Sequence, residues 1–178
     1  HVVECVAPLG GEAYAPGTAV TLHVDALHQT LGDQLVGDAG DDTFTPNGAN
    51  AGEAGDTIDL SNGGHDKVVF NTVLNLNAAT TISSFTLGSF TQAGGNGDTI
   101  NVSGLLTALG YTGARDVASL AWISGDPVKG MLKVDPGTDA ADLMLRIYNG
   151  SGWQDMALIT GVDLTGKSVS DLIASGNL

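Results

Sequence analysis

The architecture of the chain can be inferred from residues 32–66, GDQLVGDAGDDTFTPNGANAGEAGDTIDLSNGGHD. This segment is dense in glycine and aspartate. It repeats one short unit, in which a glycine, a spacer and an aspartate are followed by another spacer and an apolar residue. Copies of this unit, several of them incomplete, lie at 32–36, 37–45, 52–60, 63–68 and 94–102. Such self-similarity predicts a repeat architecture, and the alternative is a loop-rich β domain with ordinary Asp-Gly turns.

The order of residues within the unit predicts a tight turn followed by a short strand. Glycines permit positive φ and let backbone carbonyl groups converge in the turn. The aspartate ends the turn and points its carboxylate into the gap between stacked turns. The apolar residue two places later lies on the same side of the strand as the aspartate, so it is expected to point into a narrow core. Calcium prefers about six to eight oxygen ligands, and stacked turns supply both carboxylates and carbonyls.

The charge of the chain is strongly negative and unevenly distributed. The formal net charge is −14, from 6 Lys+Arg against 20 Asp+Glu. Lys67 is the only cation before Arg115, although twelve acidic residues precede Arg115. Carboxylates at this density repel one another in a compact state, and bound divalent cations or solvation would relieve the repulsion. The charge argues against nucleic acid or an anionic membrane as a partner, because both require patches of lysine and arginine.

Length and composition predict one ordinary folded domain, with room for a small appendage. The 178 residues include only 15% charged residues, so the chain is not a disordered acidic tail. No apolar run approaches the roughly 18 residues that span a membrane, and no signal peptide is predicted. Cys5 is the only cysteine, so no internal disulfide is possible. A secreted domain without disulfides needs a sufficient core or another staple, and metal is the obvious candidate.

The segments that flank the repeats are predicted to be mostly strands. Val20, Leu22 and Val24 alternate with polar residues, as in a half-buried strand. Residues 1–31 are therefore expected to be strands that cap the repeats or end an upstream domain. Further strands are predicted at 131–135, 143–148 and 153–160. Asn149-Gly150-Ser151-Gly152 is expected to join the last two as a hairpin, and Asp135-Pro136-Gly137 is expected to be a turn.

Two or three short helices are expected in the same C-terminal region. They are predicted at 103–110, 115–122 and 169–175, with Gly110 ending the first and Ser168 capping the last. The core positions predicted between the main repeat block and the first helix are Leu74, Leu76, Ile82, Phe85, Leu87 and Phe90.

Several motifs together resemble one protein family. GDAGDDTFT at 37–45 resembles the calcium-binding nonapeptide repeat of RTX proteins, G-G-x-G-x-D-x-U-x, in which U is a large apolar residue. The order of features after residue 82 resembles the C-terminal target domain of RTX proteins exported by type I secretion. The matching segments are ISSFTLGS (82–89), GDTINVSGLL (97–106), MLKVD (131–135), MALITGVDLTG (156–166) and VSDLIASGNL (169–178). Ser84 and Asn101 depart from the family, which commonly has aspartate at both positions.

The resemblance, which covers roughly residues 32–178, implies a mostly β fold class. A short calcium-binding parallel β-roll would continue into a β-sandwich or other β-rich C-terminal domain with two or three short helices. The expected divisions are an N-terminal segment at 1–31, degenerate RTX β-roll repeats at 32–70 and a β-rich secretion-target region at 71–178. One to several Ca²⁺ ions are expected. The predicted calcium-binding residues are Asp33, Gly37, Asp38, Gly40, Asp42, Gly52, Gly55, Asp56, Asp59, Gly64, Asp66 and Asp98.

The function implied by the resemblance is that of a non-catalytic, secreted or cell-surface calcium-binding module. It would carry the export signal of a large adhesin or surface protein of a Gram-negative bacterium, and it would fold on extracellular calcium. The type I secretion machinery would be its partner during export. The alternatives are a self-assembling subunit of a calcium-dependent extracellular layer or fibre, and a carbohydrate-binding or accessory module of a secreted hydrolase.

Catalysis is not expected from the motifs present. The sequence contains no HExxH, G-x-S-x-G or P-loop motif. His65 lies within a repeat and is interpreted as a turn spacer. Asp42 is expected to face calcium, whereas its neighbour Asp41 is expected to face solvent. Trp122, Tyr148 and Trp153 are candidates for stacking on sugar rings, although packing in the hairpin is their more ordinary role.

Overall fold

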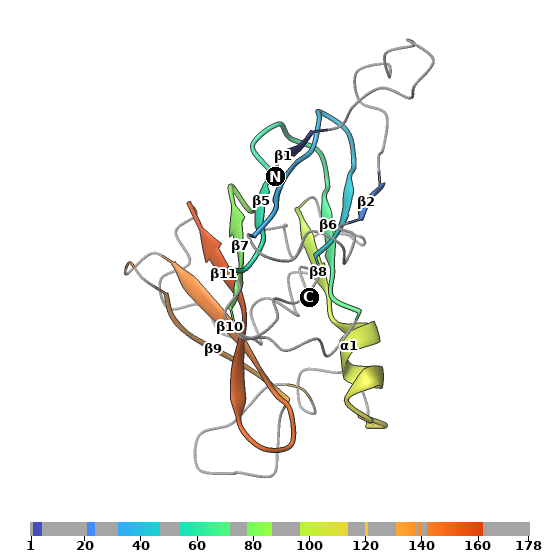
Figure 1. Cartoon of the computed structure of the whole chain (residues 1–178), viewed down its shortest axis with the longest axis vertical. Coiled ribbons are helices and arrows are strands. Elements are labelled where there is room, and N and C mark those ends of the chain that lie inside the picture. The colour runs from blue at the N-terminus through green and yellow to red at the C-terminus, as the bar shows by residue number, and fades with distance from the viewer. Residues whose placement is uncertain are drawn as a thin grey trace.

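The computed structural model of the chain is mostly β, with two sheets of parallel strands in the repeat region (Figure 1). It describes residues 2–4, 21–23, 32–46, 54–71, 78–86, 97–113, 120, 131–137, 139 and 142–161. The strands are β1 (Val2–Glu4), β2 (Thr21–His23), β3 (Gln34–Val36), β4 (Thr43–Thr45), β5 (Thr57–Asp59), β6 (Lys67–Val69), β7 (Thr80–Ser83), β8 (Thr99–Asn101), β9 (Leu132–Pro136), β10 (Leu143–Tyr148) and β11 (Trp153–Thr160). One helix, α1 (Ser103–Ala108), lies within the described part.

Consecutive strands from β1 to β8 belong alternately to the two sheets. Sheet A has the order β1-β3-β5-β7-β11-β10-β9, and sheet B has the order β2-β4-β6-β8. From β1 to β6, each strand pairs in parallel with the strand two places later in the chain. One strand of each sheet and the two turns that join them form what we term a coil. This alternation begins with β1 and β2, which lie before the predicted repeats. It continues to β8, which lies beyond residue 70, where the predicted repeat segment ends.

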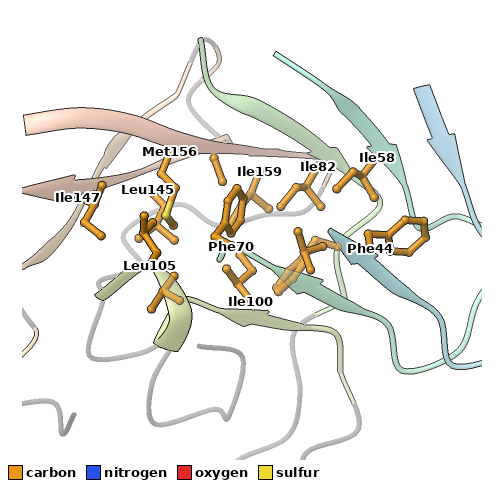
Figure 2. Packing of buried hydrophobic residues seen from close by; sticks show 14 of the residues in the cluster. Phe44, Ile58, Phe70, Ile82, Ile100, Leu105, Leu145, Ile147, Met156 and Ile159 are labelled. Carbon is orange, nitrogen blue, oxygen red and sulfur yellow. The ribbon is translucent and has the colours of Figure 1, made fainter. Parts of the chain in front are cut away.

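The apolar residue of each repeat unit forms the core between the two sheets. In sheet A, Leu35, Ile58 and Ile82 lie in register on neighbouring strands and are fully buried. In sheet B, the corresponding residues are Phe44, Val68 and Ile100. Burying such a side chain contributes about 1.5–3 kcal/mol. Figure 2 shows Phe44 and Ile58 from opposite sheets pointing toward each other. The predicted inward direction of the repeat's apolar residue is therefore confirmed.

The strand register shows how many residues separate successive coils, and this number cannot be read from the repeat units in the sequence. Asp33 lies beside Asp56, 23 residues later, and Asp42 lies beside Asp66, 24 residues later. Asp66 in turn lies beside Asp98, 32 residues later. The unit that ends at Phe44 follows the unit that ends at Leu35 by only half a coil, in the opposite sheet. The repeat unit is therefore a half-coil of one turn and one strand.

The C-terminal strands extend sheet A without a break. β11 pairs in parallel with β7, and β10 and β9 then add in antiparallel order. The hairpin of β10 and β11 confirms the strands predicted at 143–148 and 153–160. β9 continues through Pro136, which was predicted to lie in a turn, so that prediction is wrong at this residue. β9 lies at the edge of the described sheet, where a proline is tolerated because its missing N–H need not pair.

Helix α1 follows β8 and covers the end of the core. Leu105 and Leu106 are buried, and Gly110 beyond the helix has a φ of 76°. These features confirm the first predicted helix. The buried residues of α1 and of the C-terminal strands belong to the same hydrophobic cluster as those of the coils. No helix in the described part is long and apolar enough to cross a membrane.

Other sequence predictions have different outcomes. Ile82 and Phe85 are buried, as predicted for core positions. Strand β2 falls within the strand predicted around residue 22. The remaining predictions lie outside the described residues, namely Leu74, Leu76, Leu87, Phe90, the helix at 169–175 and, apart from the buried Leu120, the helix at 115–122.

The stacking of coils predicts a sharp difference between two glycine substitutions. A Cβ added to Gly55 would lie 2.0 Å from the carbonyl oxygen of Ala79 in the next coil, whereas one added to Gly152 would meet nothing within 4 Å. Gly55→Ala should therefore lower the free energy of unfolding by about 1–3 kcal/mol, as overpacking typically does. Urea unfolding of both variants measures the effect. Equal stability of Gly55→Ala and Gly152→Ala would show that the turns are not packed this closely.

Candidate functional site

The five aspartates that precede the core residues form two columns along the stack of coils. Column A comprises Asp33 and Asp56, which precede strands of sheet A. Column B comprises Asp42, Asp66 and Asp98, which precede strands of sheet B. All five residues are buried, with 1–6% of their surface exposed. Buried carboxylates require hydrogen bonds or a cation, because removing a charge from water is costly.

Each column is built by one repeated hydrogen bond between successive coils. The backbone N–H of Asp33 donates to Oδ1 of Asp56 over 3.1 Å. The N–H of Asp42 donates to Oδ1 of Asp66, and the N–H of Asp66 donates to Oδ1 of Asp98, both over 2.9 Å. The carboxylates of Asp56, Asp66 and Asp98 thus each accept the amide of the aspartate one coil earlier. Such a bond is stronger when the acceptor carboxylate is ionised than when both groups are neutral.

A second set of hydrogen bonds ties the carboxylates of column B to their turns. Oδ2 of Asp42 accepts the N–H of Asp38 over 2.9 Å, and Asp38 in turn accepts the N–H of Gly40 over 2.9 Å. Oδ2 of Asp98 accepts the N–H of Thr86 over 2.6 Å. A Cβ at position 37 would lie 2.2 Å from Oδ2 of Asp42, so any larger residue there would have to displace this carboxylate.

The turn at 37–42 stacks directly on the turn at 61–66. Nδ2 of Asn62 donates to the carbonyl oxygen of Gly37 over 2.7 Å. Gly64 has a φ of 132°, and a Cβ there would lie 2.1 Å from the carbonyl oxygen of Gly40. The two backbones approach so closely that only glycine fits at position 64. Backbone carbonyl oxygens and carboxylates are thereby gathered at one end of the coils.

The surface of these two turns carries a polar pair. The N–H of His65 donates to Oδ1 of Asp41 over 2.8 Å, and Nδ1 of His65 lies 3.4 Å from the same oxygen. Both side chains are more than half exposed, at 54% for His65 and 65% for Asp41. Asp41 therefore faces solvent, as predicted. Its neighbour Asp42 is buried.

Burial and like charge disfavour ionisation within column B. Desolvation by burial is the main cause that raises the pKa of Asp66 from 3.8 to about 7. The nearby charges of Asp98 and Asp42 raise this pKa further, while the hydrogen bond from the Asp42 amide opposes the shift. Burial also raises the pKa of Asp98, against the hydrogen bonds from Thr86 and Asp66. Column B is therefore a place where a nearby cation would favour the charged carboxylates.

The oxygen donors of the column B turns suit the chemistry of calcium. Carboxylates and backbone carbonyls are the ligands that this hard cation prefers. Within the described residues, no group of three or more His, Cys, Asp or Glu side chains is arranged so that it could hold a metal by itself. A cation at these turns would therefore draw on backbone carbonyls as well as on carboxylates.

The predicted calcium-binding residues separate into distinct sets. The described glycines among them, Gly37, Gly40, Gly55 and Gly64, lie in turns, and Asp38 organises the first turn of column B. Asp59 lies apart from both columns, because it ends β5 and its Oδ1 accepts the N–H of Ser61. Gly52 lies outside the described residues.

Two contributors to the columns were not predicted from the sequence. Thr80 is buried at the position of column A where a third aspartate would lie, beside Asp56. Asn62 contacts the preceding turn through its side chain, and its only sequence signal is a place in a glycine-rich turn.

No family model, curated protein or solved structure matches the chain.

The raised pKa of Asp66 predicts a pH dependence of stability in the presence of a chelator. Because the folded state holds the Asp66 proton up to about pH 7 and the unfolded chain releases it near 3.8, the melting temperature should fall as the pH rises between these values. Asp98 contributes in the same direction. Asp66→Asn cannot ionise and should show a shallower fall, measured by thermal unfolding in EDTA. Identical slopes for the variant and the parent would exclude Asp66 as the titrating group.

Proposed function

We propose that the chain is a non-catalytic calcium-binding C-terminal module of an RTX protein exported by type I secretion. In this proposal the coils are a short parallel β-roll, and calcium binds at the column B turns. The observation that supports it best is the buried column of Asp42, Asp66 and Asp98 at the ends of glycine-rich turns. The sequence GDAGDDTFT at the first of these turns adds to this support.

Calcium would act on this module as a ligand of the folded state. A ligand that binds only the folded state adds RT ln(1 + [L]/Kd) to its stability, or about 4 kcal/mol at a thousand times Kd. The unfolded chain does not bring the residues of column B together. Low calcium in the cytosol would then leave the coils unfolded for export, and higher calcium outside the cell would fold them.

Because the coils and the C-terminal strands share one core, calcium binding at the coils would also stabilise the rest of the module. Sheet A runs from the coils through β7 into β11, and both parts bury residues in one hydrophobic cluster. Ordering the coils would therefore provide the strand against which β11 pairs. In this proposal the C-terminal region also carries the export signal, and the parent protein is an adhesin or other surface protein.

The proposal predicts that the buried Asp66 and the exposed Asp41, which lie in adjacent coils, differ in their effect on calcium binding. Asp66→Asn removes one charge from the buried column but retains an oxygen that can accept the Asp42 amide. Asp41→Asn removes one charge from a side chain that is 65% exposed, one coil earlier. Calcium titration by calorimetry should show at least about tenfold weaker binding for Asp66→Asn, equivalent to about 1.4 kcal/mol. Asp41→Asn should bind nearly as tightly as the parent.

The outcomes of this titration test the site and the proposed function separately. Equal calcium affinity for Asp66→Asn and the parent would remove column B from the site. Absence of calcium binding by the folded parent would overturn the proposed function as a whole. Circular dichroism of each variant at saturating calcium provides the control for folding.

A further inference from the structure

The loop that joins β10 and β11 presents an asparagine–glycine pair in an unusual environment. The loop comprises Asn149, Gly150, Ser151 and Gly152. The N–H of Asn149 donates to the carbonyl oxygen of Gly152 over 3.1 Å, which closes the loop. Gly150 is exposed at its tip with a φ of 91°, and a Cβ added there would meet nothing within 4 Å. The peptide bond after Asn149 is therefore sterically open.

The side-chain carbonyl of Asn149 is held by two backbone amides. The N–H groups of Ser151 and Gly152 each donate to Oδ1 over 2.9 Å. Two donors on one carbonyl oxygen withdraw electrons from its carbon and stabilise negative charge that develops on the oxygen, as in an oxyanion hole. Among the described residues, the N–H of Gly150 donates no hydrogen bond. This nitrogen is therefore available as a nucleophile.

We propose that Asn149 is a site of spontaneous deamidation in the folded protein. The Gly150 nitrogen loses its proton to solvent base and forms a bond to Cγ of Asn149. The negative charge then lies on Oδ1, which the amides of Ser151 and Gly152 stabilise. The bond from Cγ to Nδ2 breaks, and ammonia leaves with a proton from solvent. Water opens the resulting five-membered succinimide to aspartate or isoaspartate at position 149.

The two products differ in their fit to the hairpin. An aspartate retains an oxygen at the Oδ1 position and accepts the two amides with a full charge, so it preserves the loop. An isoaspartate inserts an extra backbone atom next to the Tyr148–Trp153 pair, whose ring centroids lie 5.5 Å apart. Isoaspartate therefore alters the aromatic end of this hairpin.

Asn62 provides an internal comparison, because it also precedes a glycine. Its Nδ2, which would have to leave, donates to the carbonyl oxygen of Gly37 over 2.7 Å in the neighbouring turn. The attacking nitrogen of Gly63 donates to the carbonyl oxygen of Leu60 over 3.5 Å. Stacking of the coils thus restrains both the leaving group and the nucleophile at Asn62.

The test measures deamidation at both sites in the full chain. The protein is incubated in mildly alkaline buffer, folded and in urea, and peptide mapping by mass spectrometry follows each asparagine. The rate at Asn149 should be at least as high in the folded protein as in urea. In the folded protein, the rate at Asn149 should exceed the rate at Asn62 roughly tenfold. This factor is well below the ~10² that one preformed oxyanion donor supplies in enzymes. In urea the two rates should converge.

Two controls make the result decisive. Asn149→Asp supplies the product standard, and Asn149→Gln removes the five-membered ring while retaining the side-chain amide. Modification at position 149 should disappear in Asn149→Gln. A slower rate at Asn149 in the folded protein than in urea, or a folded rate no greater than that of Asn62, would overturn the inference.

Discussion

Successive coils are held together by the hydrogen bond from a buried aspartate's amide to the carboxylate of the aspartate one coil later. The N–H of Asp42 binds Asp66, and the N–H of Asp66 binds Asp98. The bond fixes the turn of one coil onto the next at the point where β-strand pairing begins. Immediately after it, Lys67 and Thr99 donate their amides to the carbonyls of Asp42 and Asp66, over 2.8 Å each. Turn geometry and sheet register are thus set together.

This arrangement places like charges in a shared low-dielectric environment. Column B holds three carboxylates, and burial raises the pKa of two of them. The acidic composition of the chain adds to the repulsion. The proposed calcium would offset this cost. The carboxylates of column B would then both hold successive coils together and bind the ion. An apolar residue at these positions would remove the cost but would leave the amides of the preceding coil without their acceptors.

Local features were predictable because the signal for each lies within a few residues, whereas the pairing of the aspartates was not. The spacing of Asp42 and Phe44 places both on one side of a strand, and the structure buries both. The sequence predicts a turn at Pro136, because nothing near it indicates that β9 lies at a sheet edge. Asp66 and Asp98 meet across 32 residues, since turn lengths differ between coils and conceal the register. The contact of Asn62 with the preceding turn depends on the same register and was missed for that reason.

Hydrogen–deuterium exchange at the amides of Asp42 and Asp66, with calcium and with EDTA, tests whether calcium holds the coils together. These amides are the donors in column B, so their protection reports whether the carboxylates keep successive coils in contact. We predict strong protection in calcium and much weaker protection in EDTA, because the chelated coils lose the stability that calcium adds. Equal protection of both amides in the two buffers would contradict the claim that folding of the coils depends on calcium.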